Sequence, residues 1–486
     1  MRLYLINPSN PLVSLVKLRE SFWNRFRVWK PLSLMVLAGL TPRDWDITIF
    51  DENRHLPDYE ALPRPDLVGI TAFTSQASRA YELAAHFRGK GVPVIMGGIH
   101  ATMCIEEAAE HVDCVVTGEA ETVWPQILDD FCNGRLRRRY DAAPADMGKV
   151  PLPRHDLLKG YFFGAIQTTR GCPLNCTFCS VTAFNGARYR HRPISEVIDE
   201  LKTIRERAVL IVDDNLIGTR AAHIERAKEL FRTMIAAKVR KKWIAQVTIN
   251  FADDPELLRL ASKAGCRGVY IGFESPSVEG LAEVGKKFNL LKDADFHGAV
   301  QRIRQHKIQV VGSFIVGLDV DKPGIGRCIA KAAKEYGIDY LSLLLLTPLP
   351  GTRLYNDMAA EDRIALNHYP TDWKYYTLTF PVARYKHLTM GGIIDEAVSC
   401  NRRFYAPGAI ARRIWDNLRH FRKPLATLAG NLAYHRNLRF SEQAYVAFKS
   451  NGGGHPRVIQ PPDTMRIDSV SRPVQGPSVE RLERVT

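Results

Sequence analysis

The chain of 486 residues has no long apolar run. Its most apolar stretches, 31–40 and 341–350, are about half the ~20 residues that a membrane-spanning helix needs. Residues 1–11 also lack the basic region and the long apolar core of a secretory signal. We therefore expect a cytoplasmic protein without a transmembrane segment.

Cysteine is scarce as well. Nine cysteines in a chain of this length are too few for a disulfide scaffold. Three of them crowd into residues 172–179, and the other six are scattered. In a reducing cytosol the crowded trio indicates a metal site. Apolar residues make up 45% and charged residues 24%, which excludes a collagen-like, mucin-like or wholly disordered chain.

The positive charge is unevenly distributed. The net charge is +15, and residues 401–486 hold 15 Lys and Arg against six Asp and Glu. This excess indicates either a solvated tail or attraction to an anionic substrate, partner or membrane surface. No sequence signature of a nucleic-acid-binding fold accompanies it, so we expect no DNA or RNA partner.

The first 140 residues alternate strand and helix patterns. The apolar strand candidates are 1–8, 46–53, 66–73, 92–98 and 112–121. Such runs between helices predict a parallel sheet covered on both faces, which binds ligands at the carboxyl ends of its strands. The residues at or just beyond those ends are Asn7, Thr71, Ser75, Gly97, Gly98, His100, Thr117, Gly118 and Glu119. Many are small or carry a hydroxyl, which suits close approach to a large flat ligand.

A linker at 141–160 separates this unit from a second α/β unit at 161–389. Its strand candidates are 163–170, 207–215, 242–250, 268–275, 308–319 and 338–352, with helix patterns between them. Because a closed barrel has eight such units, six of them predict a partial, open (β/α)6 barrel. Residues 390–445 read as a helical region, and 450–486 as a disordered tail rich in Pro, Gly and Ser.

The decisive segment is a cysteine motif in the loop after the first barrel strand. Cys172, Cys176 and Cys179 have the spacing CxxxCxxC. Three thiolates can hold three irons of a [4Fe–4S] cluster and leave the fourth iron open to a small chelating ligand. A zinc ion would normally need a fourth protein ligand, for which His191 is the candidate. Three unrelated core cysteines are the remaining alternative.

The segment RGCPLNCTFC resembles the cluster loop of the radical S-adenosylmethionine (SAM) superfamily, and with the strand pattern the resemblance spans about 163–385. It implies that SAM binds the open iron and is cleaved to methionine and a 5′-deoxyadenosyl radical, which abstracts a hydrogen atom. It places Phe178 near the adenine and Asp213, Asp214 and Asn215 near the methionine amine, although the frequent GGE form is absent here. By the same resemblance Glu274 lies near the ribose or the amine, and Gln246 and Asn250 follow on the next strand.

Residues 1–140 resemble the Rossmann-like, cobalamin-binding domain that precedes the radical barrel in one large subgroup. The domain order and the segments 97–102 and 116–121 carry this resemblance. It implies that the strand-end residues given above line a cobalamin site. Asn53 stands where many such domains have a cobalt-binding histidine, and His55 is displaced by two residues. We therefore expect cobalt without a lower histidine ligand.

This pairing of domains implies a methyltransferase acting on an unactivated carbon or phosphorus of a small molecule. An electron donor such as flavodoxin or ferredoxin would serve the cluster. The alternatives are a radical oxidoreductase, cyclase or rearrangement enzyme, a non-catalytic cobalamin sensor, and a radical enzyme that modifies tRNA or inserts sulfur. The basic, aromatic helices at 402–440 would either pack as ordinary helices or rest on a membrane surface.

Overall fold

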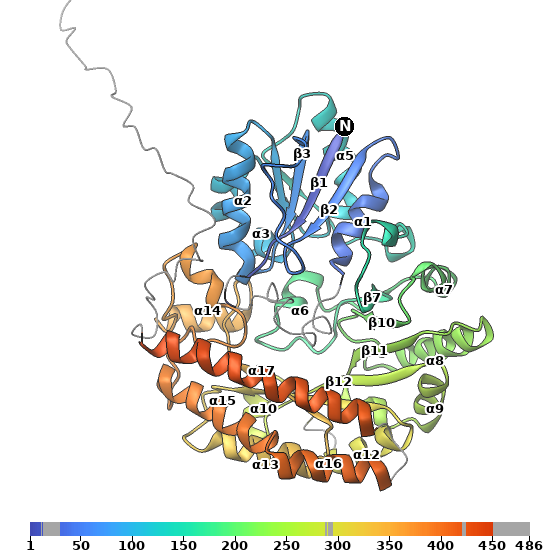
Figure 1. Cartoon of the computed structure of the whole chain (residues 1–486), viewed down its shortest axis with the longest axis vertical. Coiled ribbons are helices and arrows are strands. Elements are labelled where there is room, and N and C mark those ends of the chain that lie inside the picture. Colours follow the sequence, from blue (N-terminus) through green and yellow to red (C-terminus); the bar gives the residue numbers. More distant parts are fainter. Residues whose placement is uncertain (11, 13–29, 287–288, 290–294, 420–423, 451–486) are drawn as a thin grey trace, which may run out of the picture.

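A computed structural model of the chain describes residues 1–10, 12, 30–286, 289, 295–419 and 424–450. Two parallel six-stranded sheets follow one another along the chain, each with its own helices. The helices at the C-terminal end of the described chain pack beside the second sheet and its helices (Figure 1). The expected α/β class, with a partial barrel as the second unit, is confirmed. The tail expected at 450–486 lies outside the described residues from 451 onward.

The N-terminal sheet has the strand order β2-β1-β3-β4-β5-β6, and every pairing in it is parallel. Its strands are β1 (Arg2–Asn7), β2 (Asp46–Asp51), β3 (Leu67–Thr71), β4 (Val94–Gly97), β5 (Cys114–Thr117) and β6 (Arg139–Asp141). Its helices are α1 (Leu32–Leu40), α2 (Ala77–Gly89), α3 (Ile99–Met103), α4 (Ile105–His111) and α5 (Trp124–Cys132). The first five strands confirm the predictions. The apolar residues of β1, β3 and β5 are buried, as expected of strands covered on both faces.

Two features of this domain differ from the sequence predictions. The edge strand β6 was not predicted, because its three residues lie in a charged, aperiodic segment and form a strand by pairing with β5. The helix pattern at 100–111 is divided into α3 and α4 at Cys104, whose φ of −128° and ψ of 61° interrupt the helix.

The second sheet has the order β14-β13-β12-β11-β10-β7, again parallel, with β7 and β14 at its edges. Its strands are β7 (Phe163–Ile166), β10 (Ala208–Ile211), β11 (Lys242–Val247), β12 (Cys266–Glu274), β13 (Gln309–Val316) and β14 (Tyr340–Leu345). The helices after these strands are α7 (Ile194–Thr203), α8 (Ala221–Ala236), α9 (Pro255–Lys263), α10 (Val278–Glu283), α12 (Phe296–Gln305), α13 (Ile325–Glu335) and α14 (Arg353–Ala360). This open arrangement of six strands confirms the expected partial barrel.

The two faces of the barrel sheet differ in exposure. In β11, Trp243, Ala245 and Val247 are buried in the core beneath the outer helices, whereas the alternating Lys242 and Gln246 are exposed. Because side chains alternate between faces along a strand, the inner face of this strand is accessible from solvent.

Three further helices follow the barrel: α15 (Met390–Phe404), α16 (Pro407–Arg419) and α17 (Pro424–Ser450). They confirm the helical region expected after residue 390. Helix α15 begins with Thr389, whose hydroxyl accepts a hydrogen bond from the Gly392 backbone N–H at 3.0 Å. No helix in the described parts of the chain is long and apolar enough to cross a membrane.

Candidate functional site

The three motif cysteines lie on the loop that joins β8 (Thr169–Arg170) to β9 (Arg190–His191). These two short strands pair antiparallel, with Thr169 opposite His191 and Arg170 opposite Arg190, so the loop begins and ends at one place. Gly171 has a φ of +87°, and a Cβ there would lie 2.1 Å from the backbone oxygen of Arg188. Only glycine fits this position, and the loop therefore closes tightly just before Cys172.

The thiols share one local environment. Cys176 is buried, and Cys172 and Cys179 are half-buried. Burial raises the pKa of Cys176 to about 11 and also raises the pKa of Cys172, while the nearby Lys286 ammonium acts in the opposite direction on both. Cys179 also acts electrostatically on the pKa of Cys172 and Cys176, and Cys172 acts on that of Cys176, so the three lie near one another. A buried cation beside them favours the thiolate form, which is the form that binds iron.

No three His, Cys, Asp or Glu side chains within the described ranges converge on a point that suits a single metal ion. His191, the alternative zinc ligand, is exposed on β9. The sulfur donors, their common loop and the adjacent buried cation fit an iron–sulfur cluster. Ligation of that cluster by Cys172, Cys176 and Cys179 stays a prediction.

Two carboxylates beyond the end of β10 hold the base of this loop. Asp213 is buried and accepts hydrogen bonds from the backbone N–H and the hydroxyl of Thr168, both at 2.5 Å. Asp214 accepts from the Gly171 N–H at 2.7 Å and from Asn185 Nδ2 at 2.9 Å. Burial raises the pKa of Asp214 to about 6, against the effect of these two hydrogen bonds. Both residues were predicted near a cosubstrate amine, and the partners that the structure gives them are groups of the cysteine loop.

Unpaired amide oxygens lie at the ends of the next strands. Asn215 and Asn250 are buried, and their Nδ2 groups donate to Thr248 Oγ1 at 3.4 Å and to the Gly218 carbonyl at 3.3 Å. The Oδ1 atom of each is buried without a hydrogen-bond partner. A buried acceptor left unpaired costs about 1–3 kcal/mol, which a ligand that donates a hydrogen bond would recover. Asn215 therefore fits its predicted contact with the SAM amine. Asn250, predicted on the next strand, offers a second unpaired acceptor, and Gln246 is exposed on the inner face of β11.

Glu274 ends β12 with an unusual backbone conformation, a φ of +64°. Its buried carboxylate accepts from Lys286 Nζ at 2.8 Å, and Gly272 leaves room for the pair, since a Cβ there would lie 2.1 Å from Glu274 Oε1. A strained, buried residue at a strand end is typical of a functional site. The pair lies beside the cysteines, because Lys286 influences the pKa of Cys172 and Cys176.

The barrel also braces the cysteine loop from the start of α14. Arg353 Nη2 donates to the backbone oxygen of Asn175 at 2.5 Å, and the Leu354 N–H donates to the backbone oxygen of Thr177 at 3.1 Å. Phe178 is partly buried against the barrel core. The aromatic residue that was predicted near the adenine therefore lies where the loop meets the barrel.

Six of the predicted ligand-lining residues are half-buried at the carboxyl ends of the N-terminal strands: Asn7, Thr71, Ser75, Gly97, Gly98 and Gly118. The Asn7 side chain donates to Asp51 Oδ1 at 2.9 Å and accepts from Gln76 Nε2 at 3.3 Å. His55 is exposed on the turn after β2. This edge of the sheet is therefore partly accessible, as a bound flat ligand requires, and its contacts with such a ligand stay a prediction.

The other three predicted lining residues are buried and bound to protein groups. His100 is fully buried and contacts the Tyr81 hydroxyl at 2.8 Å and Glu107 at 3.4 Å. The Thr117 hydroxyl donates to Asp141 at 2.7 Å. Glu119 forms ion pairs with two arginines of the cysteine loop's base. These three residues thus support the edge of the sheet through protein contacts, and Nδ1 of His100 is buried without a hydrogen-bond partner.

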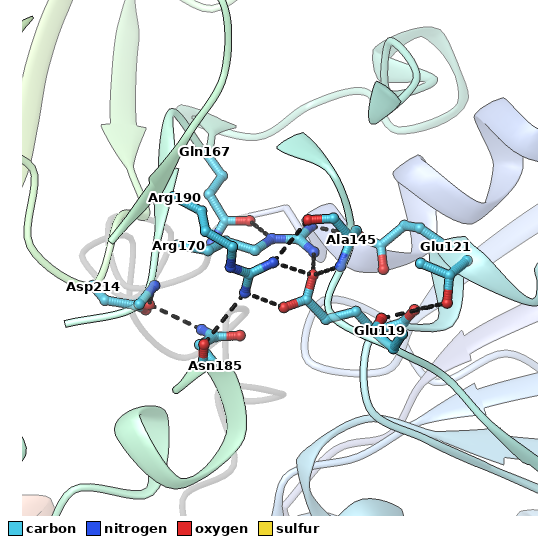
Figure 2. Close-up of polar contacts among 11 residues, drawn as sticks. Glu119, Glu121, Ala145, Gln167, Arg170, Asn185, Arg190 and Asp214 are labelled. Atoms are coloured by element: carbon cyan, nitrogen blue, oxygen red, sulfur yellow. Dashed lines mark hydrogen bonds and ion pairs between the residues drawn. The ribbon is translucent and has the colours of Figure 1, made fainter. Parts of the chain in front are cut away.

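The ion pairs of Glu119 join the two domains (Figure 2). Arg170 Nη1 lies 2.7 Å and Arg190 Nη1 lies 3.0 Å from Glu119 Oε2, while Arg170 also pairs with Glu121. Neither arginine is marked as a site residue by the sequence alone. The position of Arg170 directly before Gly171 of the cysteine motif is a local signal that could have identified it. The position of Arg190 opposite Arg170 depends on a strand register that only the fold reveals.

The comparisons with known proteins agree with this geometry. Residues 166–323 match the model of the radical SAM superfamily, and residues 24–128 match that of the B12 binding domain. The chain is 30% identical to the bacteriochlorophyllide d C-12(1)-methyltransferase of Chlorobaculum tepidum over 79% of this chain and 84% of that protein. It is also 30% identical to the bacteriochlorophyllide d C-8(2)-methyltransferase of the same organism, over 71% and 80%.

Among solved structures, the radical SAM methyltransferase TsrM of Kitasatospora setae, with cobalamin and a [4Fe–4S] cluster bound, has the same fold. The TM-score is 0.63 at 17% identity, and the similarity covers 90% of this chain and 99% of that one. The order of the two matched domains is the order of the two sheets described above.

Proposed function

Since the chain belongs to the cobalamin-dependent radical SAM methyltransferases, we propose that it transfers a methyl group to an unactivated carbon of a large ring-bearing substrate. The cofactors of this family are a [4Fe–4S] cluster, SAM and cobalamin. The single observation that carries the proposal is the placement of the cysteine loop against the strand-end edge of the B12-binding domain. In this arrangement a substrate between the domains can meet both cofactors.

Different residues of the chain would bind the cluster and SAM. Cys172, Cys176 and Cys179 would bind the cluster, and the unpaired oxygens of Asn215 and Asn250 would accept hydrogen bonds from SAM. When bound, the cluster and SAM supply a radical that removes a hydrogen atom from the substrate, and cobalamin supplies the methyl group. The Glu274–Lys286 ion pair would keep a balanced charge beside the thiolates.

The identity of the substrate class rests on the relatives. The two relatives act, by their names, on C-12(1) and C-8(2) of bacteriochlorophyllide d, a large ring-bearing molecule. The accessible inner face of β11 is consistent with a bulky substrate. We therefore extend the proposal to a substrate that contains a flat, largely apolar ring system. A small donor protein such as flavodoxin or ferredoxin would supply the electrons.

The test is anaerobic reconstitution of the full chain with iron, sulfide and hydroxocobalamin, followed by reduction in the presence of SAM. We expect close to one cobalamin and about four irons per chain, together with 5′-deoxyadenosine. A methylated product is expected when a bacteriochlorophyllide is added. Mass spectrometry of that product separates methyl transfer from cyclisation or another rearrangement, since only methyl transfer adds CH₂.

Two alanine variants make the test specific. Cys176→Ala removes a buried thiol of the loop and is expected to abolish iron binding and 5′-deoxyadenosine formation. Cys328→Ala removes an exposed thiol on α13, away from the loop, and is expected to behave as the wild type. Equal 5′-deoxyadenosine formation by the two variants would refute the radical mechanism, and iron binding without cobalamin would refute the cobalamin-dependent one.

A further inference from the structure

Two guanidinium groups face each other at the base of the cysteine loop. Asp214 of the barrel acts on Arg170 electrostatically, but in the described residues the direct ion pairs of both arginines come from the N-terminal domain. The loop is closed by a ladder of only two residue pairs, and one of them sets Arg170 directly opposite Arg190. Like charges directly opposite each other destabilise a strand pair. Both guanidinium groups are also largely buried, with 10% and 13% of the side chains exposed, so water screens their repulsion poorly.

The N-terminal domain supplies the compensating charge. Glu119, just after β5, contacts both arginines, and its side chain is only 4% exposed. Burial tends to raise the pKa of Glu119, but the two guanidinium groups hold it below its usual value, so the carboxylate stays ionised. With Glu121 paired to Arg170, two carboxylates balance two guanidinium groups (Figure 2).

The linker between the domains is tied into the same contacts. The Ala145 N–H donates to Glu119 Oε2 at 2.9 Å, and the Ala145 carbonyl accepts from Arg190 Nη1 at 2.9 Å. Arg170 is oriented from the barrel side by Gln167 Oε1 at 2.7 Å. Glu119, the linker and both ends of the cysteine loop therefore form one connected set of buried polar groups (Figure 2).

We infer that Glu119 is a positioning residue, which couples docking of the B12-binding domain to closure of the cysteine loop. The carboxylate offsets the repulsion between the two loop ends only when the domains are docked. The loop therefore closes when the B12-binding domain is in place. The inference rests on the proposed function only for the identity of the two cofactors, and its geometry rests on the ion pairs alone.

The first test is amide hydrogen exchange of the purified full-length chain, which needs no cofactor. Glu119→Gln keeps the size of the side chain and removes its charge, and we expect exchange in 169–191 to accelerate at least about tenfold. The matched control is Glu82→Gln, which removes a carboxylate 64% exposed on α2 and paired with Arg79. We expect no change in 169–191 for that variant.

A second variant separates positioning from simple loss of stability. In Glu119→Gln/Arg190→Gln the like-charge pair across the ladder no longer exists, and Arg170 keeps Glu121 as its partner. If Glu119 acts by neutralising the loop ends, exchange in 169–191 returns most of the way to the wild-type rate. If the double variant exchanges as fast as Glu119→Gln or faster, the inference is wrong.

The second readout is the distance between the domains in the reconstituted enzyme. Cys132 at the end of α5 and Cys328 on α13 are exposed, one in each domain, and accept nitroxide labels after the cluster is in place. Pulsed EPR should give one narrow distance distribution in the wild type and a broadened one in Glu119→Gln. Identical distributions would overturn the inference. A chain that takes up neither cofactor would refute the proposed function, and its exchange data would still decide the role of Glu119.

Discussion

Replacement of Gly171 by alanine should disrupt the cysteine loop far more than the same replacement at Gly186. Both glycines lie in the loop with positive φ, +87° and +77°, so alanine is strained at either position. They differ in the space around them. A Cβ at position 171 would lie 2.1 Å from the Arg188 backbone oxygen and 3.1 Å from that of Gly186, whereas a Cβ at position 186 meets nothing within 4 Å.

The magnitudes follow from this difference. The backbone strain costs about 1–3 kcal/mol in each variant. At position 171 the Arg188 carbonyl must also move by about 1 Å, and forcing such a shift in a packed region costs typically ~1–3 kcal/mol more. Because Arg188 lies two residues before β9, the shift would be transmitted to the ladder that closes the loop. The difference of ~1–3 kcal/mol corresponds to about 5–150-fold in the population of the closed loop.

The assay compares the two variants after anaerobic reconstitution. We expect Gly186→Ala to keep its iron nearly as the wild type does. Gly171→Ala should bind less iron per chain and lose it to a chelator about 5–150-fold faster. Equal rates of iron loss in the two variants would refute the reasoning, because the close backbone contacts at position 171, chiefly with the Arg188 carbonyl, are what distinguish them.

Two further predictions concern buried carboxylates outside the loop. Glu200 is fully buried and binds Arg192 and, at 3.0 Å, His155. Glu200→Gln leaves the buried Arg192 with only the more exposed Glu196 as a carboxylate partner, at 4.0 Å. We expect a cost of ~3–5 kcal/mol and a melting temperature lower by roughly 5–15 °C, and a change below about 2 °C would contradict this. Burial raises the pKa of Asp321 to about 6, although its Oδ2 accepts from Gly317 and Leu318. Because the folded pKa lies above the unfolded one, this residue lowers the stability as the pH rises from about 4 to about 6. Asp321→Asn should remove that decline and raise the stability above pH 6 by about 3 kcal/mol, as melting curves between pH 4 and 7 would show.

Much of the fold was predictable because each strand carries its own signal. The predicted strands of both sheets are largely apolar runs followed by helices, and this local pattern suffices to place them. The edge strand β6 carries no such signal, since its residues are a charged Arg139, Tyr140 and Asp141 that pair only because β5 is beside them. The break between α3 and α4 at Cys104 was likewise invisible to helical periodicity.

The site was predictable to a lesser degree. The cysteine motif was recognisable because its spacing lies within one short loop. The roles of Asp213, Asp214 and Glu119 depend on partners far away in the sequence, such as Thr168, Gly171 and Arg190. A strand-end carboxylate looks the same in sequence whether it contacts a ligand or holds a loop. Only the tertiary structure shows that these three carboxylates bind the base of the loop.

These three carboxylates come from both domains, so the cysteine loop is held from two sides. Asp213 and Asp214 hold its first residues from the barrel, through Thr168 and Gly171, while Glu119 holds the two arginines at its ends from the other domain. The barrel contacts are made within the barrel itself, whereas the direct ion pairs that oppose the repulsion between Arg170 and Arg190 come from the N-terminal domain. Loop closure is therefore a property of both domains together. A barrel expressed without residues 1–140 should retain the carboxylates that hold Thr168 and Gly171 and still fail to keep the ladder between β8 and β9 closed.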